Sequence, residues 1–419
     1  MTRILHLSML YPPHIMGGAE RSVALLAEAQ VAAGHAVAAS CISPTGWKEE
    51  ERNGVRVWRM PHETDFWPEE WPQHHVLARG VRRFKQQFNH RIEAHFGRVI
   101  DAFRPDVVHT HSLLDVSTRV WLAARARGLP VVHTLRDFDL ACGTAAMFRD
   151  GQRCRRRCLE CRGFTFMKAR HHRAVDAVVG VGAGILRSHL ELGYFGHVAE
   201  QLRRVIWNPA VVEGIGADYV KPSLAGQPLT FGYLGRINVE KGVGTLLDAC
   251  ARLPVGDWRL LVAGKEASEA DSLRPRAAGL PVEFLGFVPP REFFDRIDVL
   301  VVPSLWAEPL PRTILEAYAA GVPVIGADSG GIPDLIGAHN REWLYPPGDA
   351  AALAQAMLRV WARGRDALPR REAFASVLQD TTPRKVARRY LELYDEVRAH
   401  RAAHGRRSPV ARAAAGASA

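Results

Sequence analysis

Two carboxylates eight positions apart lie in PSLWAEPLPRTILEAYAAGVPVIGADSGG, residues 303–331. Glu308 follows a short β-branched run. Glu316 lies more than one turn inside a helix that we expect to include Pro311 in its first turn, where proline is tolerated. Carboxylate oxygens accept hydrogen bonds from paired hydroxyl groups, and free N–H groups at a helix N-terminus attract phosphate. The pattern suits a nucleotide sugar, although two solvated glutamates beside a helix start would show the same spacing.

A second pattern is FGYLGRINVEKGVGTLLDAC, residues 231–250, in which an apolar run leads into a glycine-rich loop and a helix. The loop carries Arg236 and Lys241. A guanidinium group can bind two phosphate oxygens, and an ammonium group adds a mobile charge. The pair can therefore stabilise a departing diphosphate without a metal ion. Such loop residues are often only solvated, but their occurrence in the same half-chain as the two glutamates favours ligand binding.

The surrounding elements predict an α/β protein. The chain has 419 residues, too many for one ordinary core, and 47% of them are hydrophobic. Continuous apolar runs, typical of parallel strands covered on both faces, alternate with helical segments. The runs are RILHLSML, HAVAASC, DVVHTH, LPVVHTL and DAVVGVG, then LTFGYLG, WRLLVAG, VEFLGFV, DVLVVPS and VPVIGAD. We expect two Rossmann-like domains with doubly wound parallel sheets.

Six motifs occur in the order typical of a known enzyme family. They are YPPHIMGGAER (11–21), DVVHTH (106–111), VVHTLRDF (131–138), GRINVEKG (235–242), EPLPRTILEA (308–317) and GGIPDLI (330–336). With them the chain resembles the retaining glycosyltransferases of the GT-B architecture, specifically the E-x7-E group called family 4. The resemblance covers residues 1–395 and implies transfer of a hexosyl group, across a cleft between the domains, from a nucleoside-diphosphate sugar to an acceptor hydroxyl.

The resemblance also implies individual roles. Arg236 and Lys241 would hold the diphosphate, Glu316 the ribose and Glu308 the hydroxyls of the donor sugar. Glycines near the N-terminus would let the backbone approach the diphosphate. The implied donor-binding set is Gly17, Gly18, Arg236, Lys241, Glu308, Leu310, Pro311, Arg312 and Glu316. The implied catalytic residues are Glu308, His111, Arg236 and Lys241, with no cofactor required for catalysis.

His109 and His111 end the run DVVHTH, across the expected cleft from the glutamates. We expect their side chains to point to different faces of the strand and assign His111 to the cleft, where the resemblance implies a histidine in contact with a sugar. An imidazole can relay the acceptor proton because its pKa is close to neutrality. The alternative is a structural histidine, which we favour for His133.

The acceptor side departs from the family pattern. Arg136 stands before Asp137, where family members commonly have a histidine. Because arginine cannot exchange protons, we expect Arg136 to pair with a carboxylate or phosphate of the acceptor, beside Asp137 and His111. EPLP replaces the usual E-P-F-G, which leaves the donor sugar open. Asp137 and Asp139 spell D-x-D, a metal motif of another transferase class, which we interpret as coincidental.

Four of the six cysteines fall in DLACGTAAMFRDGQRCRRRCLEC. Cys142, Cys154, Cys158 and Cys161 resemble a set of structural zinc ligands, which would staple a loose loop. Free thiols in a reducing cytosol or disulfides in an exported protein are the alternatives. We expect no catalytic role for the metal.

Charge is concentrated in the N-terminal half. Residues 1–210 contain 29 Lys plus Arg against 20 Asp plus Glu, within a total net charge of +11. An amphipathic stretch at 81–103 presents Val81, Phe84, Phe88 and further apolar residues at helical spacing. It is either a core helix or a helix that touches an anionic membrane bearing a lipid-linked acceptor. Nucleic-acid binding is not expected, because no recognised module accompanies the charge.

We expect an acceptor-binding domain at residues 1–208 that includes the cysteine loop 142–161, and a nucleotide-sugar-binding domain at 209–381. A terminal helix at 382–400 would cross back to the first domain, and 401–419 would be disordered. With no signal peptide or long apolar run, we expect a cytoplasmic protein, either free or peripheral on the inner face of the membrane. The acceptor would be a glycan, a lipid-linked glycan or a small molecule. Alternative functions are a nucleotide-sugar 2-epimerase-like enzyme and a non-catalytic nucleotide-sugar-binding protein.

Overall fold

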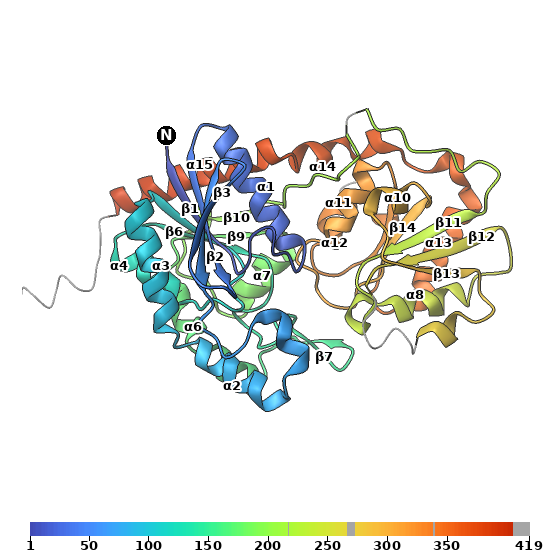
Figure 1. Cartoon of the computed structure of the whole chain (residues 1–419). Coiled ribbons are helices and arrows are strands. Elements are labelled where there is room, and N and C mark those ends of the chain that lie inside the picture. The colour runs from blue at the N-terminus through green and yellow to red at the C-terminus, as the bar shows by residue number, and fades with distance from the viewer. Residues whose placement is uncertain (217, 266–272, 338–339, 405–419) are drawn as a thin grey trace, which may run out of the picture.

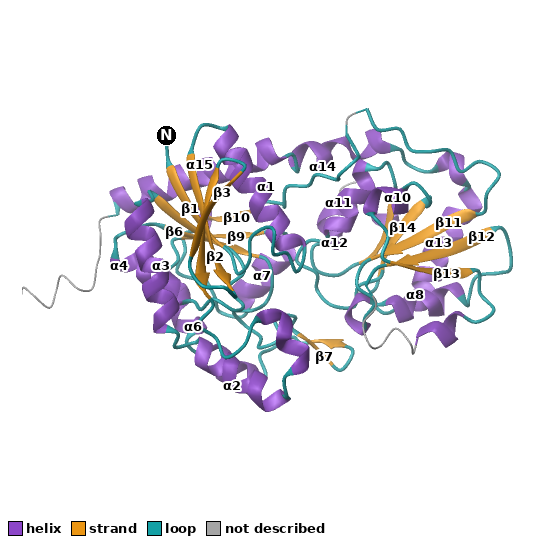
Figure 2. Cartoon of the chain, viewed as in Figure 1, coloured by secondary structure: helices purple, strands orange, loops and turns teal. Residues whose placement is uncertain are grey.

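The computed structural model describes residues 1–216, 218–265, 273–337 and 340–404. These residues form two α/β domains, each built on one mainly parallel sheet flanked by helices (Figures 1 and 2). All ten apolar runs named above contain strands. The predicted fold class is therefore confirmed.

The N-terminal domain contains a sheet of order β10-β9-β6-β5-β1-β2-β4-β3, parallel except for β3. Its strands are β1 (Arg3–Leu7), β2 (Ala36–Ser43), β3 (Lys48–Arg52), β4 (Val55–Pro61), β5 (Val107–Thr110), β6 (Val131–Leu135), β9 (Ala177–Gly180) and β10 (Arg203–Val205). A separate hairpin pairs β7 (Phe148–Arg149) with β8 (Gln152–Arg153). The helices are α1 (Gly18–Ala32), α2 (Val76–Gln86), α3 (His90–Phe103), α4 (Arg119–Ala126), α5 (Leu159–Thr165), α6 (Lys168–His171) and α7 (Ala183–Glu191).

The C-terminal domain contains a parallel sheet of order β13-β12-β11-β14-β15-β16. Its strands are β11 (Leu229–Leu234), β12 (Trp258–Ala263), β13 (Val282–Gly286), β14 (Val299–Val302), β15 (Val324–Ala327) and β16 (Leu344–Tyr345). The helices include α8 (Val243–Cys250), α10 (Pro290–Phe294), α11 (Arg312–Ala319), α12 (Ile332–Ile336), α13 (Ala350–Arg363) and α14 (Ala375–Asp380). Because β11 and β14 are neighbours, the loops that follow them meet at one edge of the sheet.

The chain crosses between the domains twice, and the two crossings lie side by side. The backbone N–H of Ala210 donates to the carbonyl oxygen of Thr381 at 3.0 Å. Beyond the second crossing, α15 (Pro383–Ala403) runs along the N-terminal domain and packs against α1 (Figure 1). Residues 401–403, expected in the disordered tail, instead continue this helix. The rest of that predicted tail, from residue 405 onward, lies outside the described residues.

The amphipathic stretch 81–103 is two helices and not one, because the chain turns between α2 and α3. The side chain of Asn89 caps α3 by accepting the N–H of Ile92 at 3.1 Å. The apolar residues of α3 are buried in the core, whereas Val81, Phe84 and Phe88 are 51%, 48% and 39% exposed. The sequence pattern therefore divides into a core helix and a surface helix. None of the described helices is long and apolar enough to cross a bilayer.

Candidate active site

The structure brings Lys241 and Glu308 together where the loops after β11 and β14 meet. Nζ of Lys241 lies 2.8 Å from Oε1 of Glu308, and the hydroxyl of Ser304 donates to the same oxygen. The ammonium group also lies 5.4 Å from the ring centroid of Trp306. The side chains of Lys241 and Glu308 are only 17% and 8% exposed. Their attraction is thus screened less than that of a surface ion pair.

Backbone contacts hold the two loops in register. The carbonyl oxygen of Glu240 accepts the N–H of Leu305 at 2.9 Å. Gly242 has φ +73°, and a Cβ at this position would lie 1.9 Å from the carbonyl oxygen of Pro303. Only glycine fits there, since both the backbone angle and the close approach exclude a side chain.

Other predicted donor residues lie on the same two loops or on α11, which follows the second loop. Arg236 is 64% exposed and contacts Glu240 of its own loop at 3.4 Å, so its guanidinium group is accessible to a ligand. On α11, Glu316 accepts a long contact of 3.5 Å from Arg312. Leu310 is buried. Pro311 was predicted to lie in the first turn of α11. It is instead the residue immediately before this helix.

Arg312 connects the two domains. Its NH1 donates to the hydroxyl of Ser22 on α1 at 2.9 Å. A Cβ on Gly18 would lie 2.3 Å from Cδ of Arg312, and the neighbouring Gly17 donates its N–H to Glu20 at 3.0 Å. The start of α1 therefore faces the start of α11, with the Arg312 side chain between them. The sequence analysis placed Arg312 in the donor site but did not predict this contact between the domains.

A second contact between the domains was missed by the sequence analysis. The carboxylate of Asp334, in the GGIPDLI motif, accepts the N–H of Ala183 at the start of α7 at 2.6 Å. Backbones approach closely beside it. A Cβ on Gly182 would lie 2.5 Å from the carbonyl oxygen of Pro309, and one on Gly184 would lie 2.5 Å from that of Gly330. The run GVGAG, residues 180–184, carried the only sequence signal for this contact.

His111 is buried inside the N-terminal domain. Its Nε2 lies 3.0 Å from Nδ1 of His6, and its Nδ1 accepts from Nε of Arg136 at 3.3 Å. Burial, followed by the charges of His109 and Arg136, holds its pKa well below the ordinary value. With both ring nitrogens occupied and the ring neutral, His111 is not placed to relay an acceptor proton as predicted.

The expected divergence of His109 and His111 is wrong. Their ring centroids are 4.1 Å apart, because residues two apart on a strand share a face. Ring nitrogens of His6, His109 and His111 all lie within 4.8 Å of one another, a spacing that a metal ion would require. However, each ring is hydrogen-bonded to protein partners, and the permanent cation of Arg136 donates to this cluster. The cluster is therefore a hydrogen-bonded core.

Arg136 also donates hydrogen bonds to protein partners. Besides His111, it donates to Oδ1 of Asn208 in the interdomain connection. Asp137 accepts the hydroxyl of Ser112 at 2.8 Å and the N–H of Asp139 at 2.9 Å. Burial, aided by the charge of Asp139, raises the pKa of Asp137 to about 6. A carboxyl group that titrates near neutrality can exchange a proton with a bound hydroxyl.

The D-x-D sequence does not form an open metal site. Asp139 is 2% exposed and pairs with Nζ of Lys168 at 2.5 Å. The two carboxyl groups thus have separate protein partners, in agreement with our interpretation of this motif as coincidental.

The four clustered cysteines lie around the β7–β8 hairpin. Sγ of Cys161 lies 3.6 Å from Sγ of Cys142, and Sγ of Cys158 accepts the N–H of Cys161 at 3.4 Å. Burial, followed by the charges of Cys142 and Cys158, raises the pKa of Cys154. Cys161 therefore contacts both Cys142 and Cys158.

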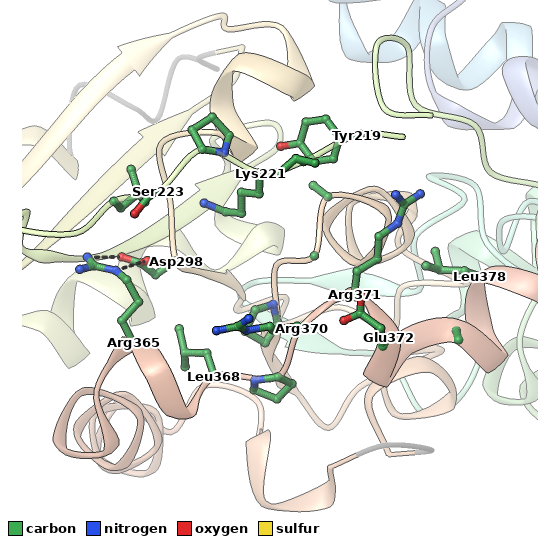
Figure 3. Close-up of a pocket in the computed structure, with 18 of the residues that line it drawn as sticks. Tyr219, Lys221, Ser223, Asp298, Arg365, Leu368, Arg370, Arg371, Glu372 and Leu378 are labelled. Carbon is green, nitrogen blue, oxygen red and sulfur yellow. Dashed lines mark hydrogen bonds and ion pairs between the residues drawn. The ribbon is translucent and has the colours of Figure 1, made fainter. Parts of the chain in front are cut away.

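Two cavities lie at different places relative to the predicted site residues. One, of about 670 Å³, lies between the domains and is lined by residues 151–155 at the β7–β8 hairpin and by Leu305, Asp328 and Ser329. The other, of about 790 Å³, is formed by residues 219–224, the end of α11 and residues 365–379 (Figure 3). There Arg365 donates twice to Asp298. None of the predicted site residues lines this second cavity.

Comparison with known proteins agrees with the two-domain fold. Residues 17–205 match the model of a glycosyl transferase 4-like domain, and residues 228–363 match that of glycosyl transferases group 1. HepE from Anabaena, solved in complex with UDP, has a similar structure, with a TM-score of 0.66 at 17% identity over 94% of this chain and all of HepE. The family models and the fold together indicate a glycosyltransferase of the GT-B type.

Two sequence relatives add to this. The chain is 27% identical over 334 residues to an uncharacterized 42.6 kDa protein in the cps region of Klebsiella pneumoniae, covering 79% of this chain and 87% of the relative. It is 34% identical over 156 residues to the amylovoran biosynthesis glycosyltransferase AmsK of Erwinia amylovora, covering 34% and 38% of the two chains. The two family models together span both domains and support a glycosyltransferase of the GT-B superfamily.

Proposed function

We propose that this enzyme transfers a hexosyl group from a nucleoside-diphosphate sugar to an acceptor hydroxyl with retention of configuration. The observation that carries the proposal is the 2.8 Å contact between Lys241 and Glu308. An ammonium group beside a carboxylate matches the two sides of the reacting bond of such a donor, a charged diphosphate and a hydroxylated sugar. On donor binding, Lys241 turns to the phosphate and Glu308 accepts the sugar hydroxyls.

In the reaction, the bond between the anomeric carbon and the diphosphate oxygen breaks. The acceptor oxygen bonds to the same face of that carbon, and the acceptor proton passes to the departing phosphate oxygen. Arg236 and Lys241 stabilise the negative charge that develops on the diphosphate, so no metal ion is needed at this step. The start of α1, at Gly17 and Gly18, adds free N–H groups and a positive helix end. Glu316 binds the ribose, which displaces its 3.5 Å contact with Arg312.

The acceptor is the growing end of a polysaccharide or its lipid-linked precursor. In support, AmsK is named for amylovoran biosynthesis and HepE binds UDP. Asp137 is the residue of the N-terminal domain that we assign to the acceptor hydroxyl, because its raised pKa of about 6 suits a hydrogen-bonded exchange. A 2-epimerase-like enzyme would consume donor without an acceptor, and a binding protein would show no turnover.

The test starts from thermal shifts with UDP, GDP, ADP, TDP and their sugar conjugates, since a ligand that binds the native state raises its melting temperature. One nucleotide series should stabilise the wild type but not Arg236→Ala. Arg388→Ala is the control, because Arg388 is equally exposed at 67% but lies on α15. The stabilising donor is then incubated with lipid-linked and polysaccharide acceptors, and the anomeric configuration of the product is read by NMR. An inverted product, or no response to any nucleotide, would contradict the proposal.

We further propose that the enzyme binds an anionic membrane through the exposed face of α2. Phe84, Phe88 and Phe166 form an aromatic cluster, with ring centroids 5.5 to 6.4 Å apart, and all three are more than a third exposed. The N-terminal 210 residues carry a net excess of nine positive charges, which complements anionic lipid.

The membrane proposal is tested by sedimentation with lipid vesicles. The wild type should sediment with vesicles rich in phosphatidylglycerol and less with neutral ones. The double variant Phe84→Ser, Phe88→Ser should lose this binding, while Phe287→Ser, which changes a phenylalanine that is 82% exposed in the C-terminal domain, should retain it. Equal binding by all three proteins would rule out this surface.

A further inference from the structure

We propose that Cys142, Cys154, Cys158 and Cys161 bind one zinc ion that fastens the β7–β8 hairpin to the N-terminal domain. The Sγ atoms of Cys142 and Cys161 are 3.6 Å apart. A disulfide would require about 2.05 Å. Two thiolates at about 2.3 Å from a tetrahedral zinc ion lie about 3.8 Å apart. The observed separation therefore matches one edge of a zinc tetrahedron.

The second pair of ligands is arranged by local structure. Cys158 and Cys161 form a C-x2-C sequence, and the N–H of Cys161 donates to Sγ of Cys158 at 3.4 Å. This bond fixes the Cys158 side chain against the first turn of α5. Cys161 therefore connects the C-x2-C turn to Cys142.

The hairpin supplies the fourth ligand. The N–H of Cys154 donates to the carbonyl oxygen of Met147 at 2.8 Å, and Phe148 pairs with Arg153 across the hairpin. This pairing brings the backbone of Cys154 beside Met147, in the segment that begins at Cys142. Among the described residues, no third cysteine sulfur lies within 4.8 Å of both Cys142 and Cys161. Zinc binding must therefore draw Cys154 and Cys158 onto that pair, with release of the thiol protons.

The hairpin needs such an anchor because it has little core of its own. Most of residues 149–160 are exposed, and the hairpin region is tied to the domain by contacts such as Arg153 to Ser188 at 3.1 Å and Arg157 to Tyr194 at 3.0 Å. Figure 1 shows the hairpin extending from the N-terminal domain toward the C-terminal domain, where residues 151–155 line the interdomain cavity. The metal would thus stiffen one wall of this cavity between the domains.

The first experiment measures metal in the full-length protein purified without chelator. Elemental analysis should find one zinc per chain in the wild type and in Cys250→Ala, the control at a buried cysteine of α8. Cys154→Ser and Cys158→Ser should lose the zinc. Protein produced with cobalt should show the visible d–d absorption of a tetrahedral thiolate site. These readouts do not depend on transfer activity, so they separate the metal site from the proposed function.

The second experiment follows the hairpin itself. Trypsin should cut the wild type slowly and the chelated wild type quickly after the arginines at 153 and 155–157, and added zinc should restore protection. Because it uses unmutated protein, this measurement remains valid even if a cysteine variant misfolds. Metal-free protein with six titratable thiols would overturn the proposal. Four or fewer thiols without metal would also overturn it, in favour of a disulfide.

Discussion

The ion pair between Lys241 and Glu308 can be tested by removing the ammonium group, which leaves the buried carboxylate without its counter-charge. In the wild type Glu308 is 8% exposed and accepts a hydrogen bond from Ser304, and we expect Lys241→Ala to retain this bond. Removing one partner of a fully buried pair costs about 3–5 kcal/mol. The 17% exposure of Lys241 and the retained hydrogen bond reduce our expectation to about 2 kcal/mol. For a domain of this size, that corresponds to a melting temperature lower by about 4–8 °C.

The matched control is the double variant Lys241→Ala, Glu308→Gln, which also removes the negative charge that the single variant leaves unpaired. Its melting temperature should recover to within about 3 °C of wild type, whereas both variants should lose turnover by about 100-fold or more. Melting is followed by circular dichroism, and turnover by release of nucleoside diphosphate. If Lys241→Ala melts like wild type, or if the double variant melts no higher than the single one, the ion pair is not the buried contact described here.

Two further changes test other parts of the site. The pKa of Asp137 rises from 3.8 to about 6 on folding, so its contribution to stability is present below pH 3.8 and lost as the pH rises through 6. This shift corresponds to about 3 kcal/mol at most. Asp137→Asn should therefore gain stability relative to wild type in urea unfolding at pH 8 but not at pH 4, and an equal difference at both pH values would contradict the assignment. Asp334→Ala removes the acceptor for the N–H of Ala183 and should favour domain opening, seen as a larger radius of gyration in X-ray scattering; an unchanged radius would mean that this contact does not hold the domains together.

The fold was predictable because its signals are local. Each buried strand is a short continuous apolar run, and the two loops of the donor site follow two such runs. Their meeting follows from a general rule, since loops after neighbouring parallel strands lie at the same edge of a sheet. Lys241 and Glu308, 67 residues apart, could thus be assigned to one site before their contact was seen.

The parts that the sequence could not predict depend on packing between distant segments. The spacing of α2 and α3 looks continuous, and only the cap at Asn89 shows that the chain turns there. The contact of Asp334 with Ala183 joins residues 151 positions apart in different domains. No periodicity encodes it. The burial of His111 depends on His6 and Arg136, which were not recognised as its partners.

These distant contacts explain why arginine stands at position 136. A guanidinium group only donates hydrogen bonds, so Nδ1 of His111 must accept and its Nε2 must carry the proton that goes to His6. His6 then donates to the side-chain oxygen of Gln30. A histidine at 136 could both donate and accept, and would leave these tautomers undetermined.

The chain of hydrogen bonds continues to the terminal helix. The amide of Gln30 donates to the hydroxyl of Tyr394 at 3.3 Å, which leaves the tyrosine proton for Nδ1 of His109 at 2.6 Å. The fixed protonation of Arg136 thus orients the donors along this chain from His111 to Tyr394, and the same guanidinium group binds Asn208 in the interdomain connection. Arg136 therefore acts on the arrangement of the protein. An acceptor does not have to carry a carboxylate or phosphate to account for its presence.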